Sequence, residues 1–368
     1  MRNLASIQRI VSLSPIEGAD KIEKAVILGW EVVIAKKDNF KVGDLVIYCE
    51  VDSILPDKPE FEFLRERKFR IKTIKLKGQV SQGIVFPLNL VHKAFHVEGR
   101  DVTEILGVRK HDPQAEFERK ETDRLANIDK TRMGKFLKRY SWYRNLVFKP
   151  TKKPFPAFIR KTDEDRIQLF PDYYKKWGNL LFSITEKVDG QSATYFCVPN
   201  PKRGLFSKKY LFGVCSRNFQ LLKPDNSSYW TLAKQLNLEE KMAKFCMQNG
   251  KGIIIQGEAI GGNFQGNKYK ISGFKLYVFN VATYDKGKCN YFHQSEMAIF
   301  CSAFGLETVP NLTYGSDLLP TIPDMVELSK GNSILNPDIP REGIVVRNYP
   351  ANISFKVINP DFLLKYSE

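Results

Sequence analysis

The sequence predicts an α+β protein in which a small β-barrel precedes a larger domain of antiparallel sheets with flanking helices. Residues 1–107 hold short β-branched and aromatic runs separated by turn residues, the pattern of a barrel of short strands. Residues 156–368 alternate strand-like runs with segments of helical spacing, which indicates an α+β domain rather than a wound parallel sheet. The length of 368 residues suits about two domains of ordinary size.

The predicted barrel depends on four runs in the first domain: KAVILGWEVVIAKK, DLVIYCEVDSILP, FRIKTIKLKG and SQGIVFPLNLV. Gly, Asp and Lys turns separate these runs, as in DNFKVGD. Four or five such strands in roughly 100 residues are typical of a barrel of the oligonucleotide-binding (OB) type. Another small β-barrel would give the same pattern.

Residues 108–155 form a basic, aromatic-rich segment that we interpret as a linker or an insertion. Its charges and rings are Lys130, Arg132, Lys135, Lys138, Arg139, Arg144, Lys149, Lys152 and Lys153, with Phe136, Tyr140, Trp142, Tyr143, Phe148 and Phe155. As a solvated linker, the segment would pack its rings on a neighbouring domain. As a binding surface, its cations would follow phosphates while its rings stack on bases. Both interpretations stand at this point.

The second domain is predicted to carry three helical segments between its strands. SYWTLAKQLNLEEKMAKFCMQNG ends at Gly250, HQSEMAIFCSAFG has Ser295 as a possible N-cap and Gly305 beyond its end, and TIPDMVELSKG is shorter. The predicted strands are LLFSITEKVDG, SATYFCV, YLFGVCSR, GIIIQGEAIG, KLYVFNVATYD, GIVVRN and ISFKVI.

The formal net charge of +16 implies either a partner or a cost in stability, because like charges repel in the compact state. Nucleic acid is the leading candidate, and an anionic membrane surface comes second. No apolar run approaches the length of a membrane span, and Arg2, Arg9 and Glu17 interrupt any signal-peptide pattern. The six cysteines form no C-x-x-C pair and the four histidines give no zinc spacing. We therefore expect an intracellular protein, cytoplasmic or nuclear, that is not secreted.

The main chemical signal begins at Lys187 in TEKVDGQS, where an apolar run meets a turn that Asp189 and Gly190 favour. A lysine at a strand end is usually a solvated surface residue, and KVDG alone is a weak motif. Its weight comes from the order of the segments that follow: SRN with Arg217, IIIQGEAIGG with Glu258, YVFNV with Phe279, EGIVVRN with Glu342, and SFKVINP with Lys356.

This ordered set resembles the motifs of the covalent nucleotidyltransferase superfamily of polynucleotide ligases and capping enzymes. RNLASIQRIVSLSPIEGADKIEKAVILGWEVVI and FKVGDLVIYCEVDSILP look like the N-terminal barrel of ATP-dependent RNA ligases of the Deinococcus and Naegleria type. KTDEDRIQ, with Arg166, is similar to a segment that this type carries before its lysine. The resemblance covers nearly the whole chain except the basic segment, and it implies an OB-like barrel followed by an adenylyltransferase domain of the ATP-grasp-like ligase type.

The resemblance implies an RNA ligase that joins a 3′-OH RNA end to a 5′-phosphate end through lysyl-AMP and adenylylated 5′-end intermediates. ATP and Mg²⁺ or Mn²⁺ are the implied cofactors. RNA, or an RNA-containing duplex with such ends, is the implied partner, and we expect a monomer that seals nicks in duplexes, as in RNA repair. The barrel would hold the strand to be joined.

The same resemblance assigns the site residues. Lys187 would be the catalytic nucleophile that carries AMP, and Glu342, Asp189 and Glu258 would support the metal. The nucleotide would contact Arg166, Glu186, Asp189, Gly190, Arg217, Glu258, Phe279, Glu342 and Lys356. Within this set Arg166 would reach the β- and γ-phosphates, Arg217 the ribose, Lys356 the α-phosphate and Phe279 the adenine face. One departure from many relatives is Ile358, where they place a second lysine; Lys365 or another basic group would have to substitute.

Three rival functions remain open at this point. A GTP-dependent mRNA-capping guanylyltransferase and a DNA ligase use the same lysine chemistry, but both usually place a barrel after the nucleotidyltransferase domain. Here the sequence runs only a few residues past Lys356, which favours an RNA ligase. A catalytically inactive nucleic-acid-binding protein is the rival of another class, and the presence of Lys187 argues against it.

Overall fold

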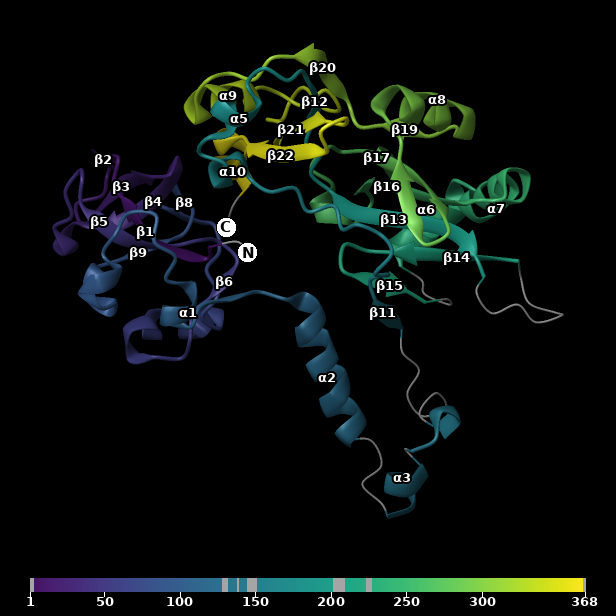
Figure 1. The fold of residues 1–368 in the computed structure, drawn as a ribbon, viewed down its shortest axis with the longest axis horizontal. Coiled ribbons are helices and arrows are strands. Elements are labelled where there is room, and N and C mark those ends of the chain that lie inside the picture. Colours follow the sequence, from purple (N-terminus) through teal and green to yellow (C-terminus); the bar gives the residue numbers. More distant parts are fainter. Residues whose placement is uncertain are drawn as a thin grey trace.

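The computed structural model describes residues 3–127, 132–137, 139–143, 151–200, 209–222 and 227–366. Two bodies lie beside each other in Figure 1, an N-terminal barrel in purple and blue and a larger C-terminal domain in teal to yellow. The segment between them descends below both bodies in this view. Within the described residues no helix is long and apolar enough to cross a lipid bilayer.

The N-terminal domain is built from short antiparallel strands. One sheet joins β1 (Ala5–Arg9), β5 (Leu45–Cys49) and β9 (Ile84–Phe86), and another joins β2 (Ser12–Pro15), β3 (Ile22–Ile27) and β4 (Trp30–Ala35). Two further pairs are β6 (Ser53–Ile54) with β10 (Arg109–Lys110), and β7 (Ile74–Leu76) with β8 (Gln79–Ser81). The predicted strand runs are confirmed.

Period-two burial explains the barrel core. Along β4 the side chains of Trp30, Val32 and Ile34 are buried, and they pack with Val46 and Tyr48 in one cluster. Alternate residues of a strand point to opposite faces, so this pattern fixes which face is inside. Short helices cover the rest: η1 (Lys36–Asp38), η2 (Pro59–Arg67), η3 (Leu88–Leu90), η4 (Lys93–Phe95) and α1 (Thr103–Leu106).

The segment after the barrel contains α2 (Pro113–Asn127), α3 (Arg132–Leu137) and β11 (Lys152–Pro154). Of its predicted cations and rings, Lys130, Lys138, Arg144, Phe148 and Lys149 lie outside the described residues. Phe136, Tyr140 and Trp142 are exposed, whereas Phe155 is buried against the C-terminal domain. Because β11 pairs with a strand of that domain, we propose that the C-terminal domain begins at β11 rather than after residue 155.

The C-terminal domain contains a large, mostly antiparallel sheet. Its strands are β11, β15 (Phe219–Leu221), β14 (Tyr210–Cys215), β13 (Gln191–Pro199), β16 (Gly252–Gly261), β17 (Phe274–Asp285) and β18 (Lys288–Tyr291), with β19 (Glu307–Thr308) parallel to β17. Three helices, α6 (Ser228–Gln235), α7 (Leu238–Asn249) and α8 (Gln294–Phe304), cover one face. Phe155 and Ile159 pack on the opposite face, against Ile254.

A second sheet stands beside the first. One of its strands ends just before Lys187, another begins just after Glu342 and a third contains Lys356. Its order is β20 (Asn311–Ser316), β12 (Phe182–Glu186), β21 (Gly343–Asn348) and β22 (Ile353–Ile358), all antiparallel. Around it lie η5 (Ile167–Leu169), α5 (Tyr173–Trp177), α9 (Ile322–Ser329) and α10 (Pro360–Tyr366), while η6 (Phe264–Asn267) follows β16. The α+β architecture predicted from the sequence is confirmed.

Two helix details differ from the sequence prediction. The long segment before Gly250 forms two helices, α6 and α7, because Asn237 takes a left-handed conformation between them. Ser295 lies inside the first turn of α8, and the residue that caps this helix is His293, whose N–H donates to Glu296 Oε2 at 2.8 Å. Gly250 and Gly305 end their helices in the left-handed conformation, as predicted.

Candidate active site

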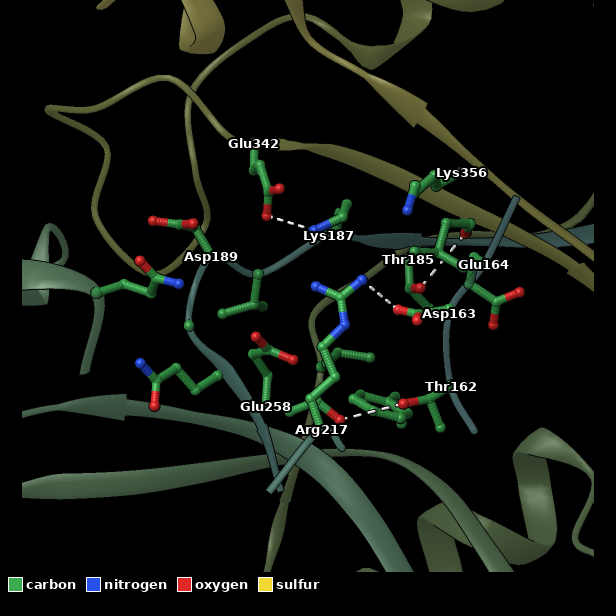
Figure 2. A pocket seen from close by; sticks show the side chains of 18 of the residues that line it. Thr162, Asp163, Glu164, Thr185, Lys187, Asp189, Arg217, Glu258, Glu342 and Lys356 are labelled. Atoms are coloured by element: carbon green, nitrogen blue, oxygen red, sulfur yellow. Dashed lines mark hydrogen bonds and ion pairs between the residues drawn. The ribbon is translucent and has the colours of Figure 1, made fainter. Parts of the chain in front are cut away.

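One cavity of about 510 Å³ lies between the two sheets of the C-terminal domain. All ten residues that the sequence motifs assigned to the site line it: Arg166, Glu186, Lys187, Asp189, Gly190, Arg217, Glu258, Phe279, Glu342 and Lys356. Figure 2 shows the carboxylates of Glu342, Asp189 and Glu258 on one side, with Lys356 and Asp163 on the other. The fold therefore brings together residues that are up to 190 positions apart, from Arg166 to Lys356.

Lys187 directly follows β12, and its backbone N–H donates to the carbonyl of Gly343 at 2.9 Å. Its Nζ lies 2.5 Å from Glu342 Oε2, and both side chains are largely buried. Burial alone would lower the pKa of Lys187, but the charges of Glu342, Glu258 and Asp189 outweigh it and raise this pKa. The lysine is consequently held as an ammonium ion, in place but not yet nucleophilic.

On the acidic side of the cavity, burial and mutual repulsion raise the pKa of two carboxyl groups, those of Glu258 and Asp189. Burial raises the pKa of Glu258 to about 8, because Lys187 only partly offsets it and Glu342 and Asp189 add repulsion. Burial and the charge of Glu342 also raise the pKa of Asp189, although Lys268 forms an ion pair with its carboxylate. In the described part of the chain, no three Asp, Glu, His or Cys side chains converge closely enough to hold a metal ion directly.

Lys268 connects this acidic side to the C-terminal helix. Its ammonium lies 5.3 Å from the ring centroid of Phe362 and 5.2 Å from that of Tyr366, both on α10. Tyr269 beside it accepts the backbone N–H of Asp189 at 2.7 Å through its hydroxyl oxygen. Two consecutive residues thus fix the turn that follows the lysine.

Gly190 is required by a close approach of two backbones. A Cβ atom at this position would lie 2.5 Å from the carbonyl oxygen of Ala259 and 2.5 Å from Ile260 Cγ2, distances that real Cβ atoms do not show. Only glycine therefore lets the turn approach β16 and the neighbouring Glu258. This contact explains the glycine of the KVDG motif.

The basic side of the cavity is formed by Lys356 and Arg166. These two residues form an isolated bridge between their chain segments, and the backbone N–H of Lys356 donates to the carbonyl of Asp165 at 2.8 Å. Burial, together with the charges of Lys187 and Arg166, lowers the pKa of Lys356 to about 8. A cation whose pKa is depressed by other cations is ready to bind an anion, because the anion relieves the repulsion.

Arg217 forms an ion pair with Asp163, and both side chains are more than half exposed at the mouth of the cavity. In Figure 2 the guanidinium of Arg217 points into the cavity toward Asp163. An exposed ion pair contributes little to stability. The arginine can therefore leave Asp163 for a stronger anionic partner at small cost.

Phe279 is turned into the cavity by a β-bulge. The register of β16 and β17 pairs Gln256 with Asn280 and then Gly257 with Val278, so Phe279 has no direct partner. Arg347 supports the ring from behind: its Nη1 donates to the carbonyl of Phe279 at 3.0 Å and its Cζ lies 5.7 Å from the ring centroid. Arg347 is itself fixed by Glu164 at 2.9 Å.

Glu186 occupies a different environment from the other acids. Its side chain is buried, and it accepts hydrogen bonds from the Ser333 hydroxyl at 2.5 Å and from the N–H of Ile334 at 2.8 Å. It therefore secures the loop at residues 333–334 and offers the cavity little of its carboxylate. Ile358 lines the cavity at the position of the missing second lysine, and the exposed Lys365 is not among the lining residues.

Arg347, Lys268 and the Ser333 clamp were not predicted from the sequence. Arg347 stands in the quoted segment EGIVVRN, and an arginine inside an otherwise apolar strand run was the available signal. Lys268 and Ser333 lie in segments with no recognisable motif. Their partners are 79 and 147 positions away, so the sequence alone could not pair them.

A barrel followed by two antiparallel sheets that enclose a lysine, three carboxylates and several cations defines a polynucleotide ligase type of fold and site. The family model of RNA ligase matches residues 181–366, half of the chain, and a model of an OB-fold domain matches residues 4–88. The chain belongs to the RNA ligase family. A comparison with curated proteins gives no match.

Solved structures of Naegleria gruberi RNA ligase are similar over the full length. The structure with PPi is 29% identical, with a TM-score of 0.69 over 100% of this chain and 99% of that chain. A mutant with ATP and Mn is 28% identical, with a TM-score of 0.68 over 99% of both chains. Another mutant with AMP and Mn is 28% identical, with a TM-score of 0.69 over 99% of both chains.

Proposed function

We propose that this RNA ligase uses ATP and a divalent cation to join a 3′-OH RNA end to a 5′-phosphate end, with Lys187 as the residue that carries AMP. The main support is the 2.5 Å contact between Lys187 Nζ and Glu342, which lies inside the cavity that all the motif residues line. The similar Naegleria gruberi ligase structures with ATP, AMP and Mn support the choice of nucleotide and metal.

The reaction divides into two transfers of one adenylyl group, followed by a step in which AMP is the leaving group. Lys187 Nζ attacks the α-phosphorus of ATP, so a P–N bond forms and pyrophosphate leaves. The 5′-phosphate oxygen of the RNA then attacks the same phosphorus, which gives an adenylylated end and returns the lysine. Finally the 3′-oxygen attacks the 5′-phosphorus, forms the phosphodiester bond and releases AMP.

The first transfer needs a neutral lysine, whereas the pKa of Lys187 is raised by its carboxylate neighbours. A dication held beside Glu342, Asp189 and Glu258 would offset their charge, lower the pKa of Lys187 and polarise the α-phosphate. Those carboxylates do not converge closely enough for direct coordination, so they would hold the ion through its water shell, as Mg²⁺ commonly allows. Glu342 additionally aims Nζ through its hydrogen bond.

The cations of the opposite side would bind the phosphates. Lys356 is partly buried and forms no ion pair with any described residue, so its ammonium can serve the α-phosphate as charge builds there. Arg166 would hold the β- and γ-phosphates in a forked contact. Arg217 would exchange Asp163 for the ribose and later for the RNA end.

The adenine would stack on Phe279, the ring that the β-bulge and Arg347 present to the cavity. We propose Arg347 as a positioning residue, because it holds the backbone and the ring of Phe279 rather than a reacting atom. Glu186 would act in the same indirect way, by fixing the loop at 333–334 through Ser333.

We further propose that the substrate is a nick in an RNA-containing duplex and that the enzyme acts as a monomer. A nicked duplex compared with the same two strands free in solution distinguishes this from single-strand joining, and a matched nick with a DNA 3′-OH end tests the requirement for RNA. Sealing of the RNA-ended nick at least tenfold faster than of two free single strands is the expected result. The reverse order of rates would replace the duplex with single-stranded ends.

Incubation with ATP labelled at the α-phosphate, with magnesium, tests the function itself. The expected result is a label that survives denaturation of the protein and disappears in Lys187→Ala. A label from GTP instead of ATP would transfer the proposal to capping chemistry. No label from either nucleotide in a correctly folded protein would refute the proposal.

A further inference from the structure

A second cavity, of about 600 Å³, lies between the barrel and α2, outside the cavity of Lys187. The barrel contributes the end of η2, the segment after it and β10, and α2 contributes Ala115, Glu116 and Arg119. Positions 115, 116 and 119 lie on one face of a helix, so α2 presents a single face to this space. We call it the α2 groove.

The α2 groove is strongly basic. Seven of its lining residues are lysine or arginine and three are acidic. Six of the cations are exposed and form no ion pair with any described residue: Arg67, Lys68, Lys72, Arg109, Lys110 and Arg119. The seventh, Arg70, is paired with Asp52 at 2.6 Å.

The acids of the groove offset only part of this charge, because three carboxylates, those of Glu66, Asp112 and Glu116, face seven cations. Glu116 pairs with Lys120 at 2.6 Å, and Asp112 accepts the backbone N–H of Gln114 at 2.8 Å at the start of α2. Six like charges around one hollow repel each other and contribute nothing to folding. Their arrangement is explained if they face a polyanion.

Helix α2 lies between the groove and the Lys187 cavity and contacts residues that line that cavity. The side chain of Gln114 donates to the carbonyl of Asn218 at 2.9 Å, and the rings of Phe117 and Phe219 lie 4.8 Å apart between centroids. Asn218 and Phe219 both line the Lys187 cavity. Figure 1 shows α2 starting in the space between the barrel and the β11–β15 edge of the large sheet.

The barrel side of the groove also reaches toward the catalytic arginines. Burial opposes ionisation of Asp52, but the hydrogen bond and charge of Arg70, followed by the charges of Arg217 and Arg166, lower its pKa. Asp52 and Arg70 therefore lie within electrostatic range of the mouth of the Lys187 cavity. A chain of phosphates that leaves this mouth would meet the groove next.

We infer that the α2 groove binds the phosphodiester backbone of the RNA substrate on one side of the joined ends. The inference rests on the proposed function and adds the place where the strand runs. Apart from His111, no aromatic side chain is among the groove-lining residues that the structure describes, whereas seven are lysine or arginine. The contacts are therefore mainly to phosphates, which carry no base sequence. The groove thus supplies affinity, while the Lys187 cavity supplies chemistry.

The test uses the full chain with Lys72→Gln, Arg109→Gln and Arg119→Gln combined. A matched control combines Lys234→Gln, Lys244→Gln and Lys251→Gln, which remove the same charge. These three exposed lysines lie in or directly after helices α6 and α7. Thermal melting of both variants checks that each is folded. Fluorescence anisotropy with a nicked RNA duplex at several salt concentrations gives the dissociation constant and its salt dependence.

The groove variant should bind the nicked duplex on the order of tenfold more weakly than the control near physiological salt. The slope of log affinity against log salt should fall by about 2–3, because each lost phosphate contact removes nearly one released counterion. Sealing should fall in parallel for a duplex with long flanks. For a duplex cut back to a few base pairs around the nick, sealing by the two variants should be equal.

Equal affinity and equal salt slope in the groove and control variants would overturn the assignment. Labelling of Lys187 with ATP separates this failure from a failure of the proposed function, because that step needs no RNA. The groove variant should be labelled as the wild type is. Loss of labelling in the groove variant alone would assign the groove to ATP and not to RNA.

Discussion

The guanidinium carbon of Arg166 lies 5.2 Å from the ring centroid of Trp30, so a residue of the barrel packs on a residue of the Lys187 cavity. Trp30 is 1% exposed and belongs to the barrel core. Gly29 beside it leaves room for Gln168 and for Ile322 of α9. The barrel was expected from the sequence to act on the RNA strand; this contact also joins it to Arg166, the residue that we propose to hold the β- and γ-phosphates of ATP.

We predict that Trp30→Leu slows adenylylation of Lys187 by about 2- to 30-fold, the range of a cation–π contact worth about 0.5–2 kcal/mol. Trp30→Phe keeps an aromatic face and should retain most of the rate. Single-turnover labelling with ATP measures both, and thermal melting corrects for lost packing. Equal rates for the Leu and Phe variants would show that the ring face does not matter.

Arg166→Ala should slow lysine adenylylation strongly and leave sealing of a pre-adenylylated RNA end nearly unchanged. The triphosphate that Arg166 is proposed to hold has already departed at that stage. Arg166→Lys keeps the charge without the fork and should fall between the wild type and the alanine variant. The two assays are run on the same protein preparation, and an equal loss in both would contradict the assignment to the β- and γ-phosphates.

The pKa of Lys356, lowered to about 8, predicts how ATP binding depends on pH. The ammonium form is present below that pKa and is lost as the pH rises through it, so affinity for a non-transferable ATP analogue should fall above about pH 8. Lys356→Arg keeps its charge throughout and should abolish this fall. Lys365→Arg, at an exposed position outside the cavity, is the control that should behave as the wild type.

Glu342→Gln should lower the pKa of Lys187. Glu342 is the largest of the charges that raise this pKa, and without it the burial that favours the neutral amine weighs more. The pH dependence of Lys187 acylation, followed by peptide mass spectrometry, should therefore shift to lower pH. Adenylylation should nevertheless decline, because Glu342 is proposed to aim the amine and support the metal. Glu307→Gln, which removes an exposed carboxylate paired with Lys275, should leave the Lys187 profile unchanged.

The sequence was a good guide to the composition of the cavity, because every motif residue lines it. Lys187 follows an apolar strand, Glu258 and Lys356 lie in strands, and Glu342 directly precedes one. Pairing of those strands leaves all four residues around one cavity. The order of the segments was sufficient to predict this. Their individual roles are still proposals for the labelling and pH experiments to decide.

Most of the features that the sequence did not predict depend on contacts between distant segments. The bulge that exposes Phe279 arises from the register of two strands, and a single strand sequence does not contain it. Trp30 belongs to the barrel core, and its ring also meets Arg166 from the other domain, a contact that the strand sequence does not contain. The break at Asn237 required a left-handed residue that helical periodicity does not detect.

Helix α10 contacts both the barrel and a residue beside the turn that follows Lys187. The backbone carbonyl of Leu364 accepts Lys75 of the barrel at 2.8 Å, while Phe362 and Tyr366 stack on Lys268, the partner of Asp189. A tilt of the barrel against the C-terminal domain must therefore either carry the turn after Lys187 with it or break one of these contacts. We therefore expect binding of RNA at the barrel to be coupled, through α10, to the position of the turn after Lys187.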